Sequence, residues 1–451
     1  MTLKTRKFLY LFFVFLFIVI TPIISMYAAG YKFSGGFKVQ KTGSLIINSN
    51  PRGARILINN KVQQNIFKKI FSSGGGYITT PAKIKNLSPE EYTVEINLKD
   101  YLPWKKKLTI NPGQSTFAED INLFKDNLPL LMMPKTEINS TISPNNKRLI
   151  TINDENEIIF IDIDSETEKI LKTENKILTD SIIRWSENSK KIIINNEIFD
   201  LNNPENPISL NKIIGKNIDD IKWDINNDNK IFYKDKNTLN YYNFNNHTNK
   251  IIFKNDFLKD YIAKNETIFF IENQKDNSLL KIYNIDEARE VNQISLPLSD
   301  YSFINYGHKL INLYDPKHKI LYLIDPYDNF KPLRETINNI TKTYWADDTR
   351  LLYTNDFEVW IFNLKNLQKK LLTRISQKID NIIWHPSNNN IIYSTNKNIN
   401  VIELDDREKY NITKIIELDG ITNTVLNKKG DTLYFYAQIG NQKGLYKLLI
   451  Q

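Results

Sequence analysis

A segment of about forty residues recurs from residue 127 to the end of the chain, and this repeat constrains the fold more than any other feature. Four copies are clearly alike, because each has an apolar strand that ends in tryptophan, a polar turn and a second apolar strand. Their tryptophans are Trp185, Trp223, Trp345 and Trp384. Weaker copies place Ile142, Ala263, Ile304 and Leu426 at the matching position. The eight positions are separated by 38 to 43 residues.

Each full copy predicts four short strands separated by polar turns, as in residues 342–374. Four short strands in a repeat of about forty residues are typical of a β-propeller blade. One four-stranded sheet cannot bury both faces, whereas blades stacked in a ring bury them against each other. The sequence therefore predicts an all-β protein with a β-propeller over residues 127–451. Eight blades are expected, and seven is the alternative if the first or last copy is degenerate.

The two ends of the repeat region are expected to close the ring together. The last copy contains only three strands, and the segment "PLLMM" at residues 129–133 precedes the first copy. This segment is predicted to supply the missing strand, which would leave no sheet edge exposed. The four tryptophans are predicted to pack between blades rather than to bind a ligand.

The repeats resemble TolB-type, WD40-like propeller repeats, in which an apolar residue is followed by Ser-Pro-Asp-Gly and a strand. The segments "SPNNKRLITI" (143–152) and "HPSNNNIIYS" (385–394) are the most similar. Asn replaces Asp-Gly in them and still suits a tight turn. The His and Asp signature of true WD40 repeats is not present. The resemblance covers residues 139–451 and implies a fold rather than a function.

Residues 1–30 are predicted to form a cytoplasmic tail and a transmembrane anchor. Basic residues precede an apolar run from Phe8 to Met26. Nineteen helical residues reach about 28 Å, close to the thickness of the hydrocarbon core of a bilayer. A cleaved signal peptide is the alternative, but its apolar region is usually shorter and ends in small residues. Bulky Met26 and Tyr27 fit such a cleavage site poorly.

The orientation of this helix depends on a nearly tied charge count. The basic residues before it are Lys4, Arg6 and Lys7, and those after it are Lys32, Lys38 and Lys41. The first group is closer to the apolar run, so the positive-inside rule predicts a cytoplasmic N-terminus and extracytoplasmic C-terminal domains. Residues 31–42, which include Gly35 and Gly36, are interpreted as a short spacer.

Residues 43–124 are predicted to form a small β domain. The segment Asn50-Pro51-Arg52-Gly53 has turn chemistry, because Pro presets φ at the first corner and Gly accepts a positive φ at the second. Residues 54–59 alternate apolar and polar, as a half-buried strand does.

This domain resembles the PEGA family through Pro51, Arg52, Gly53 and Ala54, with Arg where the family name has Glu. Downstream matches follow in order, namely "TTP" (79–81), Leu87, Tyr92, Val94, Ile96 and Tyr101. Glu91 and Asp100 stand where the family usually has Gly. The resemblance implies a small all-β sandwich, common in bacterial envelope proteins, without catalytic residues. The four residues of the motif are therefore expected to form a structural turn.

The sequence contains few signs of chemistry. Cys is absent, which excludes disulfides, zinc thiolate sites and Cys nucleophiles. The histidines are interpreted as surface loop residues without metal-ligand spacing; they are His247, His308, His318 and His385. The segment "DINNDN" (224–229) lacks the Gly and distal Glu of a calcium loop and is interpreted as a turn. We therefore expect no catalytic residue, cofactor or metal.

The net charge of +9 is spread over 60 basic and 51 acidic residues without a dense basic stripe, so nucleic acid is not expected as a partner. The leading hypothesis is a non-enzymatic, membrane-anchored binding or scaffold protein of the bacterial cell envelope. Its expected partners are the membrane, through the N-terminal helix, and a protein or cell-wall glycan. One alternative is an extracytoplasmic propeller hydrolase acting on peptide or glycan. Another is a subunit of an envelope assembly machine.

Overall fold

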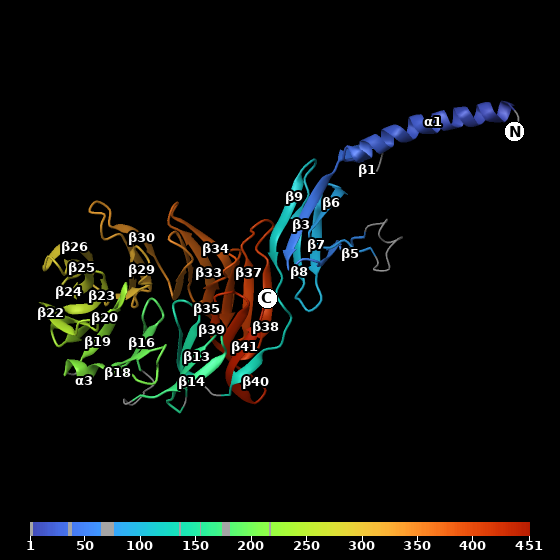
Figure 1. Ribbon diagram of the computed structural model, residues 1–451. Helices are drawn as coiled ribbons and strands as arrows, with labels where there is room; N and C mark the ends of the chain where they lie inside the picture. Colours follow the sequence, from blue (N-terminus) through green and yellow to red (C-terminus); the bar gives the residue numbers. More distant parts are fainter. Residues whose placement is uncertain are drawn as a thin grey trace. The chain divides into compact units, whose positions relative to one another are not determined.

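The computed structural model describes residues 3–34, 38–64, 76–134, 137–153, 155–173, 181–215 and 218–451 (Figure 1). The chain divides into two compact units, and each is described by itself. The first comprises Met1–Leu128 with Val401–Ile415 and Ile450–Gln451. The second comprises Pro129–Asn400 with Ile416–Leu449.

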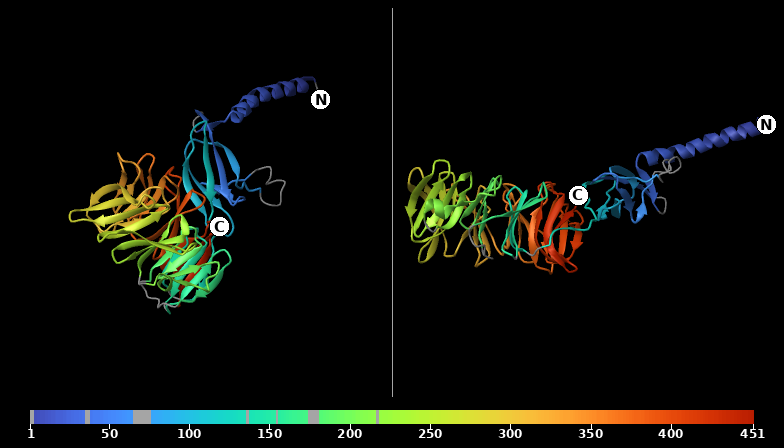
Figure 2. Two further views of the ribbon diagram at one scale, coloured as in Figure 1. Left: turned by 60° about the vertical axis from the view of Figure 1, so that its left-hand side comes forward. Right: turned by 60° about the horizontal axis from the view of Figure 1, so that its bottom comes forward.

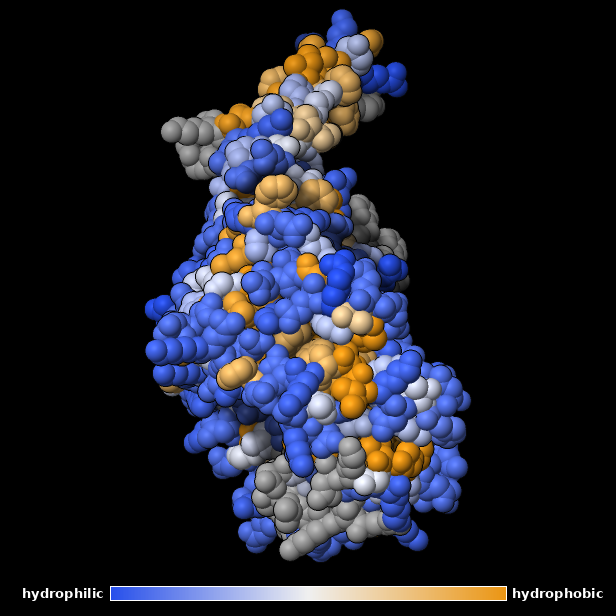
Figure 3. Space-filling view, turned by 90° about the vertical axis from the view of Figure 1, so that its left-hand side faces the viewer, coloured by the Kyte–Doolittle hydropathy of each residue, from blue (hydrophilic) through white to orange (hydrophobic). Residues whose placement is uncertain are grey.

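The first unit begins with helix α1 (Leu3–Ala28), which has no buried residue. Its mean hydropathy reaches 2.6, so by length and composition it is able to cross a membrane. Hydrophobic side chains lie on its outside (Figure 3). The helix ends at Ala28, and Gly30 follows it with a φ of +82°, the left-handed conformation that glycine adopts readily after a helix.

A hairpin follows the helix, in the segment that the sequence suggested was a spacer. Strand β1 (Tyr31–Ser34) pairs antiparallel with β2 (Lys38–Lys41), and Tyr31 lies opposite Lys41. Gly35 and Gly36 lie outside the described residues. The predicted spacer therefore has regular structure of its own on both sides of that gap.

Two sheets form the small β domain of this unit. One has the order β6-β3-β9, with β3 (Gly43–Asn50), β6 (Ala82–Leu87) and β9 (Ser115–Asn122). The other has the order β5-β4-β7-β8, with β4 (Arg55–Ile58), β5 (Lys61–Val62), β7 (Glu91–Asn97) and β8 (Trp104–Thr109). Every second residue of β3 is buried, as the alternating sequence predicts. Leu45 and Ile47 of the first sheet share one core with Ile56, Val94 and Ile96 of the second.

The predicted turn at residues 50–53 connects these two sheets. The peptide bond before Pro51 is cis, Gly53 has a φ of +89°, and the Gly53 N–H donates to Thr80 O at 2.8 Å. Ala54 is fully buried, whereas Arg52 is exposed. Asp100, one of the two residues that replace Gly, does adopt a positive φ of 65°.

The second unit, together with Val401–Ile415, is built from eight groups of four antiparallel strands, here called blades 1 to 8 in chain order. Blade 1 contains β11 (Glu137–Ile142), β12 (Arg148–Asn153), β13 (Ile158–Asp162) and β14 (Thr167–Leu171). Blade 2 contains β15 (Ile183–Trp185), β16 (Lys191–Ile194), β17 (Glu197–Asp200) and β18 (Ile208–Ser209), and the short helix α3 (Leu210–Ile214) follows it. Blade 3 contains β19 (Asp219–Asp224), β20 (Asn227–Asp235), β21 (Thr238–Asn243) and β22 (Thr248–Lys254). Blade 4 contains β23 (Leu258–Lys264), β24 (Thr267–Asn273), β25 (Asn277–Asn284) and β26 (Arg289–Pro297). Blades 3 and 4 are joined into one eight-stranded sheet by a parallel pairing of β19 with β23 at Asp224 and Ala263.

The remaining blades follow the same plan. Blade 5 contains β27 (Ser302–Ile304), β28 (Ile311–Asp315), β29 (Ile320–Ile324) and β30 (Leu333–Ile337). Blade 6 contains β31 (Lys342–Trp345), β32 (Arg350–Thr354), β33 (Glu358–Asn363) and β34 (Gln368–Arg374). Blade 7 contains β35 (Ile379–Trp384), β36 (Asn390–Thr395), β37 (Asn398–Glu403) and β38 (Ile412–Glu417). Blade 8 contains β39 (Asp419–Leu426), β40 (Thr432–Ile439), β41 (Gln442–Leu449) and, from the start of the region, β10 (Leu130–Met133).

Strand β10 closes the ring, which confirms the prediction for residues 129–133. It pairs antiparallel with β41, with Leu131 opposite Tyr446. A hydrophobic cluster joins blade 8 to blade 1, and the Thr151 and Tyr436 hydroxyls are hydrogen-bonded at 2.9 Å. The first and last blades lie side by side in both views of Figure 2. The described residues thus form an eight-bladed β-propeller, and the seven-bladed alternative is wrong.

Position within a blade explains the composition of its strands. First strands of neighbouring blades lie against one another, so they line the centre of the ring. Second strands such as β36 are buried along their whole length, and the middle of β36, Ile391 to Tyr393, is apolar. Outer strands such as β14 are exposed at nearly every residue and carry charged side chains. The hydrophobic effect therefore acts on the inner strands, which belong to the interfaces between blades.

Candidate functional site

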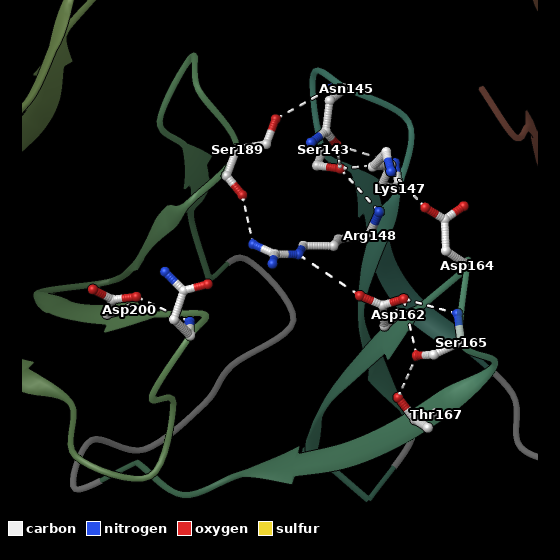
Figure 4. A network of polar contacts seen from close by, with 11 residues as sticks. Ser143, Asn145, Lys147, Arg148, Asp162, Asp164, Ser165, Thr167, Ser189 and Asp200 are labelled. Atoms are coloured by element: carbon white, nitrogen blue, oxygen red, sulfur yellow. Dashed lines mark hydrogen bonds and ion pairs between the residues drawn. The ribbon is translucent and has the colours of Figure 1, made fainter.

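In blades 1 and 2, the turn between the first two strands is closed by a serine where the sequence predicts a tight turn. In blade 1, Ser143 Oγ accepts the backbone N–H groups of Lys147 at 3.3 Å and Arg148 at 3.0 Å, and it donates to Asn145 Oδ1 at 2.8 Å (Figure 4). In blade 2, Ser186 Oγ likewise accepts the N–H of its own turn. These serines satisfy backbone groups that the turn would otherwise leave unpaired.

The same turns connect one blade to the next. Arg148 Nη1 donates to Ser189 O at 2.9 Å, and the N–H of Asn145 donates to Ser189 Oγ at 3.1 Å (Figure 4). On its other side, Arg148 lies 3.9 Å from Asp162 Oδ2 in its own blade. These hydrogen bonds and this ion pair therefore hold blades 1 and 2 together, which is a structural role.

The structure places the four repeat tryptophans against the preceding blade. Trp185 packs on the core shared by blades 1 and 2. Trp223 Nε1 donates to Arg184 O in blade 2 at 3.0 Å. The Trp345 ring is stacked on a ring of blade 5, and Trp384 lies under a guanidinium of blade 6 with the Cζ 4.8 Å from the ring centroid.

The interpretation of the histidines as surface residues is wrong for two of them. His247 is exposed and His318 is half-exposed, as expected. His308 is 9% exposed and is stacked on Trp345 with ring centroids 3.7 Å apart. His385 is 2% exposed, and its Nε2 is 2.9 Å from Gly430 O in the next blade. Burial lowers the pKa of both imidazoles, which therefore stay neutral at pH 7.

The acidic and amide residues at 224–229 form a turn, as the sequence predicts. Asp224 is 3% exposed and its Oδ1 accepts the N–H of Asn226 at 2.9 Å. Burial raises the pKa of this carboxyl. Within the part of the chain that the structure describes, no three His, Cys, Asp or Glu side chains are grouped so that they could hold a metal ion.

A cavity of about 380 Å³ lies where the first strands of blades 2 and 3 end, near the centre of the ring. We call it the channel cavity. Trp185, Trp223, Ile225, Ile262 and Tyr306 supply most of its apolar wall. Arg184, Glu187 and Lys222 add charged groups. Sequence analysis did not find this cavity, because its walls come from residues in five different repeats.

Two ion pairs link the blades around this cavity. Arg184 Nη2 is 3.0 Å from Asp220 Oδ1, which joins blade 2 to blade 3. Lys222 is paired with Asp260, which joins blade 3 to blade 4, and Lys222 Nζ also donates to Tyr261 O at 2.8 Å. Asp260 Oδ2 accepts the Phe303 N–H of blade 5 at 2.8 Å.

The sequence carries a signal for these pairs that the repeat analysis missed. Arg184 and Lys222 each come directly before the repeat tryptophan. Asp220 and Asp260 each come three residues before the repeat position of the next blade. The alternation of a basic and an acidic residue at fixed repeat positions therefore predicts a bridge between adjacent blades.

Burial in the channel cavity shifts the pKa values of two other titratable groups. Burial, followed by the charge of Asp260, raises the pKa of Tyr306 to about 12, so its hydroxyl remains a hydrogen-bond donor at neutral pH. Desolvation also raises the pKa of the Glu187 carboxyl, an effect that the charge of Lys264 opposes. The cavity thus offers apolar walls, one phenolic hydroxyl and one carboxyl that is not part of the two ion pairs.

No family model matches the chain, and no curated protein matches it. Among solved structures, the chain is similar to the C-terminal WD40 domain of Sif2, with 13% identity, a TM-score of 0.49, and coverage of 72% of this chain and 98% of that one. It is also similar to a structure of the eukaryotic initiation factor, with 11% identity, a TM-score of 0.47, and coverage of 69% and 84%. The Dos1 propeller gives 11% identity, a TM-score of 0.47, and coverage of 73% and 96%. These values are too low to carry an argument, so the propeller assignment rests on the eight four-stranded blades themselves.

Proposed function

We propose that this chain is a single-pass, membrane-anchored binding or scaffold protein of the bacterial cell envelope. In this proposal a PEGA-like module follows the anchor, and a TolB-like propeller outside the cytoplasm presents the binding surface. The observation that carries it is helix α1, whose side chains are all unburied and whose apolar run is long enough to cross a bilayer. A helix that is apolar on all sides needs an apolar environment.

The channel cavity supports a binding role for the propeller. Pockets that bind ligands are concave and mainly apolar, with a few polar groups that orient the ligand. The channel cavity combines two indole rings and isoleucine side chains with the Tyr306 hydroxyl and the Glu187 carboxyl. We propose that a side chain of a protein partner, or a sugar unit of a cell-wall glycan, enters this cavity.

Cell fractionation and protease shaving test the anchored topology. The full-length chain should stay in the membrane fraction after a carbonate wash, and intact cells or spheroplasts should release peptides from residues 127–451. A chain released by the wash, or a propeller protected from protease even in spheroplasts, would overturn the proposed location.

Binding is tested with Tyr306→Ala, which removes a wall residue and the hydroxyl. Membrane extracts should contain a partner or glycan that the wild-type chain retains and this variant loses. A matched control is Tyr327→Ala, because Tyr327 is 70% exposed and is not a lining residue of the cavity. Equal retention by both variants would remove the channel cavity as the binding site.

The hydrolase alternative has one observation in its favour, the raised pKa of Glu187 beside a cavity. Turnover of a peptide or glycan by the purified chain, lost in Glu187→Gln, would replace the binding proposal with this one. The assembly-machine alternative is separated from both by co-purification with a defined membrane complex.

A further inference from the structure

Hydrogen bonds around Thr42 connect the end of helix α1 to the small β domain. Thr42 is 6% exposed, and both its N–H and its hydroxyl donate to Gly30 O at 2.7 Å. The Gly113 N–H in turn donates to Thr42 O at 2.9 Å. The last turn of the helix, the hairpin β1–β2 and the turn at residues 111–114 are therefore bonded to one another.

A second cavity, of about 230 Å³, lies between the helix end and this hairpin. We call it the collar cavity. The helix contributes Ile23, Met26 and Tyr27, and the hairpin contributes Tyr31, Lys32 and Val39. Tyr27 is 58% exposed and Val39 is 45% exposed. The cavity is thus an apolar hollow that is open to its surroundings and has one cation among its lining residues.

The collar cavity lies at a defined depth if the helix spans a bilayer. The apolar run ends at Met26, so Tyr27 and Tyr31 come at the boundary between hydrocarbon and headgroups, where tyrosine is enriched. Lys32 comes next along the chain, at the level of the lipid phosphates. Lysines outside the cytoplasm oppose the positive-inside rule, and an anionic headgroup would give them a partner.

We propose that the collar cavity binds one anionic phospholipid of the outer leaflet. The upper part of an acyl chain occupies the hollow between helix and hairpin, and the Lys32 ammonium contacts the phosphate. Two observations point to this occupant: the cavity continues the apolar surface of the helix, and its charge is opposite to that of the phosphate. The inference rests on the proposed membrane anchoring and adds a specific lipid site to it.

Photo-crosslinking in nanodiscs tests this site on the full-length chain. The discs contain phosphatidylcholine with a minor fraction of phosphatidylglycerol that carries a diazirine near the glycerol end of one acyl chain. Crosslinked peptides are mapped by mass spectrometry. We expect crosslinks to concentrate in residues 23–39, and Lys32→Gln to reduce them about fivefold, as expected for one lysine near an anionic surface. Lys4→Gln, at the other end of the helix, is the matched control and should leave them unchanged.

Each outcome decides between the two proposals. A chain that carbonate releases from membranes overturns the anchoring and this inference together. A chain that stays in membranes but crosslinks evenly along α1, or equally in wild type and Lys32→Gln, overturns the lipid site alone. Val39→Ser provides a second variant, which should also reduce crosslinking while leaving Lys32 in place.

Discussion

Removing the charge of Asp260 is expected to destabilise the propeller more than removing the charge of Asp220, although both occupy the same repeat position. The side chains of Lys222 and Asp260 are 10% and 17% exposed, whereas those of Arg184 and Asp220 are 27% and 26% exposed. Breaking a buried ion pair by changing one partner leaves an uncompensated charge. Partly exposed pairs are screened by water and contribute little.

The expected magnitudes follow from these exposures. Asp260→Asn should lower the free energy of unfolding by about 3 kcal/mol, the lower end for breaking a buried pair, because the single amide oxygen still accepts a hydrogen bond from one of the two donors, Lys222 Nζ or the Phe303 N–H. Asp220→Asn should cost less than about 1 kcal/mol. Asn suits the second site because Asp220 has a φ of 45°, which Asn tolerates.

Urea denaturation of the detergent-solubilised chain, followed by tryptophan fluorescence, measures both changes. The double variant Lys222→Met with Asp260→Asn is the internal check. It should recover part of the lost stability, because the unpaired buried ammonium is gone. Equal losses for the two single variants, or no recovery in the double variant, would refute the reasoning that burial of the pair sets its contribution.

Three further predictions concern contacts between blades. Trp345→Ala should lower the free energy of unfolding by about 3 kcal/mol, because it removes a ring stacked on His308. Trp345→Phe keeps an aromatic ring and should cost less. Thermal unfolding of both variants measures the difference. Gly430→Ala should destabilise the protein more than Gly440→Ala. Both glycines have a positive φ, but only at Gly430 would the new Cβ lie 2.8 Å from His385 Nε2. Comparable losses of stability in the two variants would show that the strain at positive φ, and not this contact, sets the cost. His385 has a lowered pKa when folded, so the unfolded chain binds more protons and stability should fall as pH drops below about 6.5. His385→Gln should reduce this dependence of the free energy of unfolding on pH, measured by denaturation at several values from pH 7 to pH 5. An unchanged pH dependence would show that His385 is not the group responsible.

The blades were predictable because each is a local structure. A first strand, a turn and a second strand lie within about fifteen residues, so apolar patterning and turn residues indicate them directly. The repeat residues Trp185 and Trp384 indeed end strands β15 and β35. The closing strand β10 was also predictable, because a ring of four-stranded blades leaves one strand missing in the last copy.

The channel cavity and the two buried histidines were not predictable in the same way. His385 lies in a polar segment with Pro386 and Ser387, which indicates an exposed turn. It is buried because Gly430, in the next repeat, covers it. Tyr306 and Trp185 line one cavity only because blades 2 and 5 both face the centre of the ring. Neither arrangement can be recognised from the residues that are neighbours in the sequence.

By itself, the sequence determined the membrane-length helix, the small β domain and the order of the blades, and it left the number of blades at eight or seven. Hydrophobic periodicity, tryptophan spacing and turn chemistry act over a few residues and are readable in a single repeat. The tertiary structure alone decided which charges pair between blades, which histidines lose contact with water and where cavities form. The charge pairs, the buried histidines and the channel cavity depend on side chains that lie about one repeat or more apart in the chain, and only the closing of the ring brings them together. The collar cavity depends on residues closer in the chain, which the packing of the hairpin on the helix brings together.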